Sequence, residues 1–107
     1  MWLFTKNSFV SIVQHRKQPN DVLVRARVKK HLARLFPAKA DEIFEDADAD
    51  YRWRLIIPKQ ELADRLSAYI LQNLDYDNFK ATQEPDDPSW MRFLHAVWGE
   101  GLKLQIR

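Results

Sequence analysis

The chain has 107 residues, which is close to the commonest size of one protein domain and too short for two. It contains no cysteine and only two glycines, which excludes a disulfide framework, a cysteine zinc site and a glycine-rich phosphate loop. No apolar run approaches the roughly 20 residues that span a bilayer, and the N-terminal residues lack the order of a signal peptide. We therefore expect one soluble domain over residues 1–107, located in the cytoplasm and without a membrane partner.

The formal net charge of +2 conceals an uneven distribution along the chain. Residues 1–40 contain nine lysines and arginines and one acid, whereas residues 41–107 contain eight basic and fourteen acidic residues. Such an asymmetry either attracts a polyanion to one side of the molecule or brings two copies together head to tail. The alternative is that the two halves pack together and their charges intermix on the folded surface.

Strand patterns dominate the N-terminal part of the chain. Residues 2–5 and 9–15 are rich in aromatic and β-branched side chains, and the polar residues between them suit a tight turn. A third strand is expected over residues 22–27, after a polar connection. Apolar side chains alternate there with a second set that includes Arg25 and Arg27, so one face is apolar and the other is partly cationic.

The periodicity then changes to that of a helix. Val28, Leu32 and Leu35 fall on one helical stripe, and Pro37 ends the pattern. The acidic residues 41–50 follow, and we expect them to contain a short edge strand.

Residues 51–57 alternate as a strand, with Tyr51 and Trp53 on its more apolar face. Pro58 then opens the most regular helix of the chain, whose apolar stripe includes Leu66. Because the connection between this strand and this helix is so short, the helix must fold back across its own strand. We therefore expect Trp53 and Leu66 to meet in the core.

The last expected helix follows a loop over residues 75–86. Its start is marked by Asp87–Pro88, which combines a favourable N-cap with a favourable first helical residue. Gly99 and Gly101 are expected to end or fray the helix and to leave residues 102–107 as a loose tail.

This order of elements predicts an α+β protein with an antiparallel sheet that is covered on one face by two to three helices. The particular arrangement we expect is a ferredoxin-like core with an extra N-terminal hairpin.

Three stretches of the sequence stand out as motifs: Trp2–Thr5 followed by Ser8–Phe9, Asp46–Arg52, and Leu74–Lys80. On these motifs the chain resembles a family of short, uncharacterised bacterial proteins with no assigned activity. The resemblance extends along most of the chain, up to the helix that contains Trp98. It implies a bacterial, cytoplasmic protein of one domain, and it assigns no role to any residue.

The acidic stretch has the spacing that opens a calcium-binding loop, with Asp46, Asp48 and Asp50. Such a loop also needs glycine at its sixth position and glutamate at its twelfth, where this chain has Tyr51 and Ile57. An EF-hand is thereby excluded. A weaker carboxylate site for Mg²⁺ or Ca²⁺ stays open, beside the alternative of a solvated acidic loop.

The other chemically active residue types show no catalytic pattern. His15, His31 and His95 lie in different expected elements without metal-ligand spacing, so we interpret them as surface or boundary residues. No serine lies in a nucleophile-elbow context, and the acids cluster in loops where solvation is expected. The sequence therefore predicts no catalytic residue, no metal and no cofactor, and a protein that is not an enzyme.

Basic side chains on the expected strands and first helix are the strongest functional signal. Nucleic-acid binders combine cationic grooves with aromatic residues on a sheet, although no RNP-type, helix-turn-helix or zinc-finger motif is present here. The alternative is that these side chains cover the solvent face of the sheet and pair with the acidic loop. The candidate anion or nucleic-acid surface consists of Arg25, Arg27, Lys29, Lys30, Arg34, Arg52 and Arg54.

Aromatic residues near the C-terminus form a second candidate surface. They either close the core or contact a partner, since Trp and Tyr are favoured at protein interfaces. The candidate partner contacts are Tyr76, Phe79, Trp90 and Trp98.

We interpret the chain as a non-enzymatic protein-interaction module that binds a protein partner or a second copy of itself. The alternative is a nucleic-acid-binding protein that uses the basic sheet and helix surface.

Overall fold

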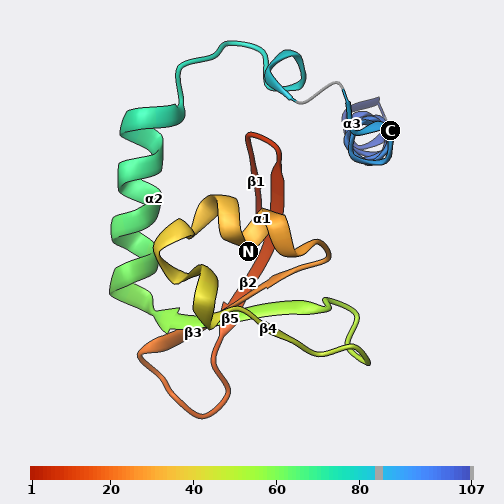
Figure 1. The fold of residues 1–107 in the computed structure, drawn as a ribbon. Helices are drawn as coiled ribbons and strands as arrows, with labels where there is room; N and C mark the ends of the chain where they lie inside the picture. Colours follow the sequence, from red (N-terminus) through yellow and green to blue (C-terminus); the bar gives the residue numbers. More distant parts are fainter. Residues whose placement is uncertain (84–85, 107) are drawn as a thin grey trace. The chain divides into compact units, whose positions relative to one another are not determined.

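The computed structural model describes residues 1–83 and 86–106, which form two compact units, Met1–Asp75 and Tyr76–Arg107 (Figure 1). The second unit contains the 3₁₀ helix η2 (Lys80–Thr82) and the helix α3 (Pro88–Ile106). The first unit contains β1 (Trp2–Thr5), β2 (Ser8–Gln14), β3 (Asp21–Ala26), α1 (Lys29–Leu35), the 3₁₀ helix η1 (Pro37–Glu42), β4 (Phe44–Glu45), β5 (Trp53–Pro58) and α2 (Lys59–Asn73).

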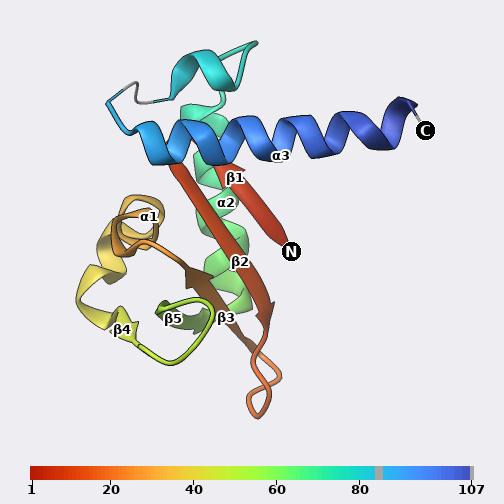
Figure 2. The same cartoon turned by 90° about the vertical axis from the view of Figure 1, so that its right-hand side faces the viewer.

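The five strands, labelled in Figure 2, form one sheet in the order β1-β2-β3-β5-β4, and all neighbouring strands are antiparallel. This confirms the predicted α+β class with an antiparallel sheet. The expected short edge strand is β4, and the expected N-terminal hairpin is β1 with β2.

The order of elements from β3 to α2 follows that of a ferredoxin-like core. β3, α1 and β4 form a split βαβ unit, β5 lies between its two strands, and α2 follows β5. A ferredoxin-like chain continues from there into a further strand, whereas this chain continues into η2 and α3. On the free side of β3 lies β2, which precedes it in the chain.

The hydrophobic core lies between one face of the sheet and the two helices α1 and α2. Strand alternation brings Val24 of β3 and Leu55 of β5 to this face, where they face each other in register. Both side chains and Leu32 of α1 are fully buried. Figure 1 shows α1 and η1 on this side of strands β3, β4 and β5. The prediction that helices cover one face is therefore confirmed for α1 and α2.

Trp53 and Leu66 both pack against the edge of this core and each is half-buried, whereas a contact between the two side chains stays a prediction. Tyr51 behaves differently from the prediction. Its ring contacts Phe9 and Arg25, which lie on the opposite face of the sheet. The alternation fails because β5 begins at Trp53, after a bend at Tyr51, so the strand pattern does not extend to this residue.

The three expected helix boundaries that depend on proline are confirmed, and α2 begins directly after Pro58. α1 ends before Pro37, and the backbone N–H of Trp90 donates a hydrogen bond of 3.1 Å to the carboxylate of Asp87 at the start of α3.

The expected loose tail is wrong for residues 102–106, because α3 continues through Gly99 and Gly101 to Ile106; residue 107 lies outside the described residues. A glycine in a helix interior costs only about 1 kcal/mol, which the surrounding helix-forming residues offset. The ammonium of Lys103 also forms an ion pair of 2.9 Å with Glu100 across this stretch.

Candidate functional site

The face of the sheet opposite α1 and α2 carries arginines among apolar side chains. We call it the open face and define it by Val13 of β2, Leu23 and Arg25 of β3, Phe44 of β4, and Arg54 and Ile56 of β5. Alternation along the strands places these residues on the side away from the core. Three of its apolar side chains are substantially exposed, at 36% for Val13, 42% for Phe44 and 37% for Ile56.

Two arginines occupy opposed strand positions in the middle of the open face. Arg25 and Arg54 are directly opposite each other in the register of β3 and β5. Like charges in such a cross-strand pair destabilise a sheet. Negative charge near the pair, from the protein itself or from a ligand, would therefore stabilise the sheet.

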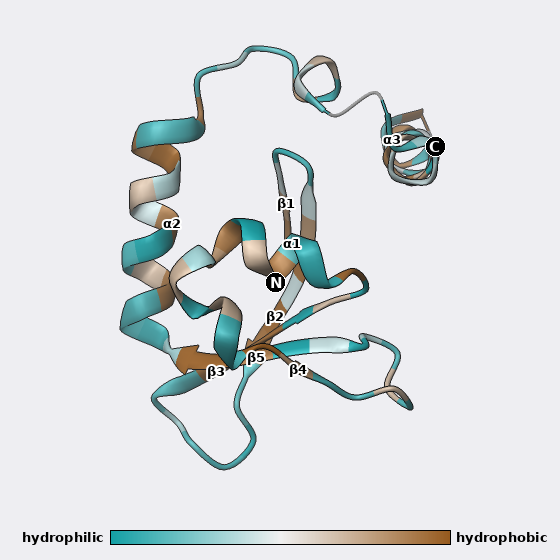
Figure 3. Cartoon of the chain, in the orientation of Figure 1, coloured by the Kyte–Doolittle hydropathy of each residue, from teal (hydrophilic) through white to brown (hydrophobic). Residues whose placement is uncertain are grey.

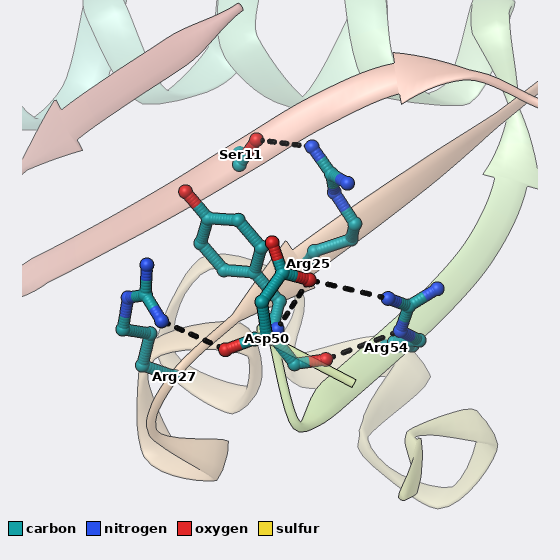
Figure 4. A network of polar contacts seen from close by, with 6 residues as sticks. Ser11, Arg25, Arg27, Asp50 and Arg54 are labelled. Atoms are coloured by element: carbon teal, nitrogen blue, oxygen red, sulfur yellow. Dashed lines mark hydrogen bonds and ion pairs between the residues drawn. The ribbon is translucent and has the colours of Figure 1, made fainter. Parts of the chain in front are cut away.

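Hydrogen bonds hold both arginines in place (Figure 4). Arg25 Nη2 donates to Ser11 Oγ at 2.7 Å, and Arg54 Nε donates to the Tyr51 carbonyl at 3.1 Å. The carboxylate of Asp50 lies 3.9 Å from Arg54 Nη2, and the Asp50 side chain is 70% exposed. An ion pair of this length and exposure neutralises little charge.

The ring of Tyr51 contacts two of the arginines. The guanidinium carbon of Arg25 lies 4.8 Å from the centre of its ring, and that of Arg27 lies 4.4 Å from it. Arg27 Nη1 also donates a hydrogen bond of 2.7 Å to the Asp50 carbonyl. Cation–π contacts of this kind fix a guanidinium without neutralising its charge.

The open face is hollowed into a depression of about 810 Å³ that extends to the loop between β2 and β3. Figure 3 shows this loop as a hydrophilic segment. It contributes Arg16 and Lys17 to the lining of the depression, beside Arg25 and Arg54, and Asp50 is the acid of the lining. The depression therefore has an excess of positive charge.

Most of this charge is not compensated within the part of the chain that the structure describes. Arg16, Lys17 and Arg25 have no carboxylate at ion-pair distance among residues 1–83 and 86–106. The Nε atom of Arg25 is buried and has no hydrogen-bond partner. An unsatisfied buried donor of this kind costs free energy, and it belongs to a guanidinium group whose charge the described residues leave uncompensated.

A second depression, bordered by η1 and α2, is electrostatically balanced. The ammonium of Lys39 lies 3.2 Å from Glu42 and 3.4 Å from Glu61. The hydrogen bond to Glu42 raises the pKa of Lys39 above its ordinary value, and the charge of Glu61 adds to this effect. The first depression is therefore the better candidate for a binding site.

The structure divides the seven predicted basic residues into two groups. Arg25, Arg27 and Arg54 gather around Asp50 and Tyr51, and Arg52 forms an ion pair with Glu45 at the β4 edge. The other three lie on α1 rather than on the open face: the ammonium of Lys29 lies 5.4 Å from the Trp53 ring, Lys30 is exposed, and Arg34 donates to the Asn7 carbonyl.

The four predicted aromatic contacts all lie in the second unit. Trp90 is buried and donates from Nε1 to Gln83 at 3.1 Å, which favours a packing role. Tyr76 and Phe79 are half-buried with ring centres 6.1 Å apart. Trp98 is 57% exposed, and the ammonium of Lys80 lies 4.6 Å from its ring.

Sequence reasoning missed Arg16, Lys17 and Phe44 as members of the site. The two cations lie in the polar connection before β3, where their charge alone is a weak signal. Phe44 is a large apolar residue within the acidic residues 41–50, and only the strand register identifies Arg54 as its neighbour.

The described residues contain no group of three or more histidine or acidic side chains placed to hold a metal ion. Within the same residues, no helix has an apolar stretch of the length that a membrane crossing requires. Comparisons of the chain with family models, with curated proteins and with solved structures find no match. The fold and the site thus define a small α+β protein whose antiparallel sheet carries a basic, partly apolar depression on its open face.

Proposed function

We propose that this protein is a non-enzymatic binding module that holds an acidic, partly apolar segment of a protein partner on its open face. The main observation behind the proposal is that Arg25 and Arg54 lie directly opposite each other on neighbouring strands. Their positive charge is poorly compensated within the described chain. Carboxylates satisfy such guanidinium groups well, because the hydrogen bonds are charge-assisted and often bidentate.

The apolar part of the depression supports a peptide over a simple anion. Val13, Phe44 and Ile56 are exposed beside the arginines, so a ligand that reaches the charges also covers apolar surface. Alternating acidic and apolar side chains on an extended peptide match such a mixed surface. Charge complementarity would provide specificity and fast association, and apolar contact would add affinity.

Nucleic-acid binding is the second candidate, and the uncompensated cations favour it. Single-stranded nucleic acids, however, are held by aromatic rings on which bases stack. Tyr51 is only 6% exposed and its ring already contacts two arginines, which leaves Phe44 as the aromatic residue of the depression lining. The surface therefore suits carboxylates better than stacked bases.

Fluorescence anisotropy with labelled synthetic ligands tests the proposal. The probes are a peptide of about ten residues that alternates aspartate with leucine or tyrosine, a polyglutamate of equal length, and a single-stranded oligonucleotide. We expect the alternating peptide to bind most tightly. The Arg25→Gln variant should weaken its binding about tenfold or more, because a charged hydrogen-bond donor is lost.

Lys6→Gln is the matched control, since Lys6 is exposed in the turn at the other end of β2 and the variant removes the same charge. It should leave peptide binding unchanged. Tighter binding of the oligonucleotide, with affinity that falls steeply as salt rises, would replace the proposal by the second candidate. Absence of binding by all three probes would reject both.

A further inference from the structure

The residues that follow α2 contain the carboxylates that would neutralise the positive charge of the open face. We call residues 74–79 the acidic segment; it contains Asp75 and Asp77 on either side of Tyr76. Both aspartates are exposed, and neither has an ion pair or a hydrogen bond within the described part of the chain. Leu74, at the start of the segment, is 56% exposed. The segment thus combines uncompensated carboxylates with apolar and aromatic side chains.

The acidic segment of a given copy starts far from the depression of the same copy. α2 begins next to β5, whose last residues face the start of β3 and, across it, the end of β2 at Gln14. Near its other end, Tyr69 accepts a hydrogen bond of 2.9 Å from the backbone N–H of Lys6, in the turn before β2. The helix therefore runs the length of β2, which is about 20 Å for seven residues.

Asp75 and Asp77 cannot reach back over this distance to their own depression. Asp77 lies four residues beyond the end of α2, and an extended chain covers at most about 3.6 Å per residue. The segment would also have to pass from the helix-covered face around an edge of the sheet to the open face. Contact between the two surfaces is therefore geometrically favoured only between different copies.

We propose that the open face of one copy binds the acidic segment of a second copy. The proposal rests on the proposed function, because it names the chain itself as the acidic partner. Arg25 and Lys17 on one copy pair with Asp75 and Asp77 on the next, and Tyr76 covers the apolar part of the depression. Each copy then offers one face and one segment, so the contact is head to tail and joins copies into a ring or an open chain.

Sedimentation analysis of three variants of the full chain tests this contact. The face variant carries Lys17→Gln with Arg25→Gln, and the segment variant carries Asp75→Asn with Asp77→Asn. We expect the unmodified protein to associate as its concentration rises, and each variant to associate at least about tenfold more weakly. The third variant, Asp46→Asn with Asp48→Asn, removes two exposed acids of another loop and should associate like the unmodified protein.

A mixture of the face variant and the segment variant gives the sharpest result. The face variant retains an intact segment and the segment variant retains an intact face, so one head-to-tail contact remains possible between them. The mixture should form a 1:1 dimer that does not grow further, although neither component associates alone. Failure of the face variant to fold leaves the comparison of the segment variant with the Asp46 and Asp48 control, which decides the proposal by itself.

An unmodified protein that stays monomeric up to about 1 mM would overturn the proposal. So would association that the segment variant leaves unchanged. If the alternating acidic peptide still binds the open face in either case, the proposed function stands with a different protein as the partner. If the peptide does not bind and the chain still associates through the segment, the proposed function fails instead.

Discussion

Tyr51 shows how one residue connects the fold to the site. It follows the exposed acidic loop and precedes β5, and both Arg25 and Arg27 lie against its ring. Its carbonyl accepts a hydrogen bond from Arg54, and its N–H donates one of 2.9 Å to the carboxylate of Asp50. A single residue therefore fixes the positions of three guanidinium groups through its ring and its backbone.

Substitution of Tyr51 separates the ring from its hydroxyl. Tyr51→Phe keeps the ring and should change the free energy of unfolding by less than about 0.5 kcal/mol. Tyr51→Leu removes both cation–π contacts and aromatic packing, and should cost about 1–3 kcal/mol. Urea denaturation of both variants measures the difference, and equal stability of the two would show that the ring does not hold the arginines.

The role of Tyr51 was not predictable from the sequence, because alternation assigns it to the same face as Trp53. The same alternation correctly separated Arg25 and Arg54 from the core residues Val24 and Leu55. Periodicity identifies a face within a strand, but it does not show where the strand begins. The bend before β5 and the pairing of β3 with β5 depend on contacts between distant residues.

At the scale of the elements, local signals predicted most strands and helices to within one or two residues. Pro37 and Asp87 mark helix boundaries through local physics, by a missing N–H donor and by a side-chain cap. The prediction that Gly99 and Gly101 end the last helix is wrong, since glycine weakens a helix without ending it. The charge of the depression was only partly predictable, because two strands and two loops contribute its charged residues.

The two glycines of α3 offer a direct test at this scale. A Cβ atom at either glycine meets no atom within 4 Å beyond the adjoining backbone of its own helix, so alanine fits without a clash. Gly99→Ala and Gly101→Ala should each stabilise the helix by about 1 kcal/mol, because alanine loses less backbone entropy in a helix. Thermal unfolding followed by circular dichroism at 222 nm measures this, and a loss of stability would show that the glycines serve a close contact.

At the scale of the whole molecule, the hydrophobic core belongs to the first unit. All members of the core cluster lie between Val10 and Leu62, and the partly buried residues packed against it extend only to Tyr69. The second unit is too short to stabilise a core of its own without additional support. The single domain expected from the length thus has its packing concentrated in residues 1–75.

A chain shortened to residues 1–75 should therefore fold. We expect a single cooperative urea transition and dispersed amide resonances, since sheet, α1 and α2 are retained. Gradual unfolding, or aggregation of the shortened chain, would show that residues 76–107 supply packing that the core requires.

The proposed function requires above all that the open face is the binding surface. Titration of the ¹⁵N-labelled full chain with the alternating acidic peptide, followed by amide chemical shifts, tests this claim directly. We expect the largest shifts at residues 13–17 and at the amides of Arg25, Phe44 and Arg54, with little change along α1. Shifts concentrated on α1, or none at saturating peptide, would contradict it.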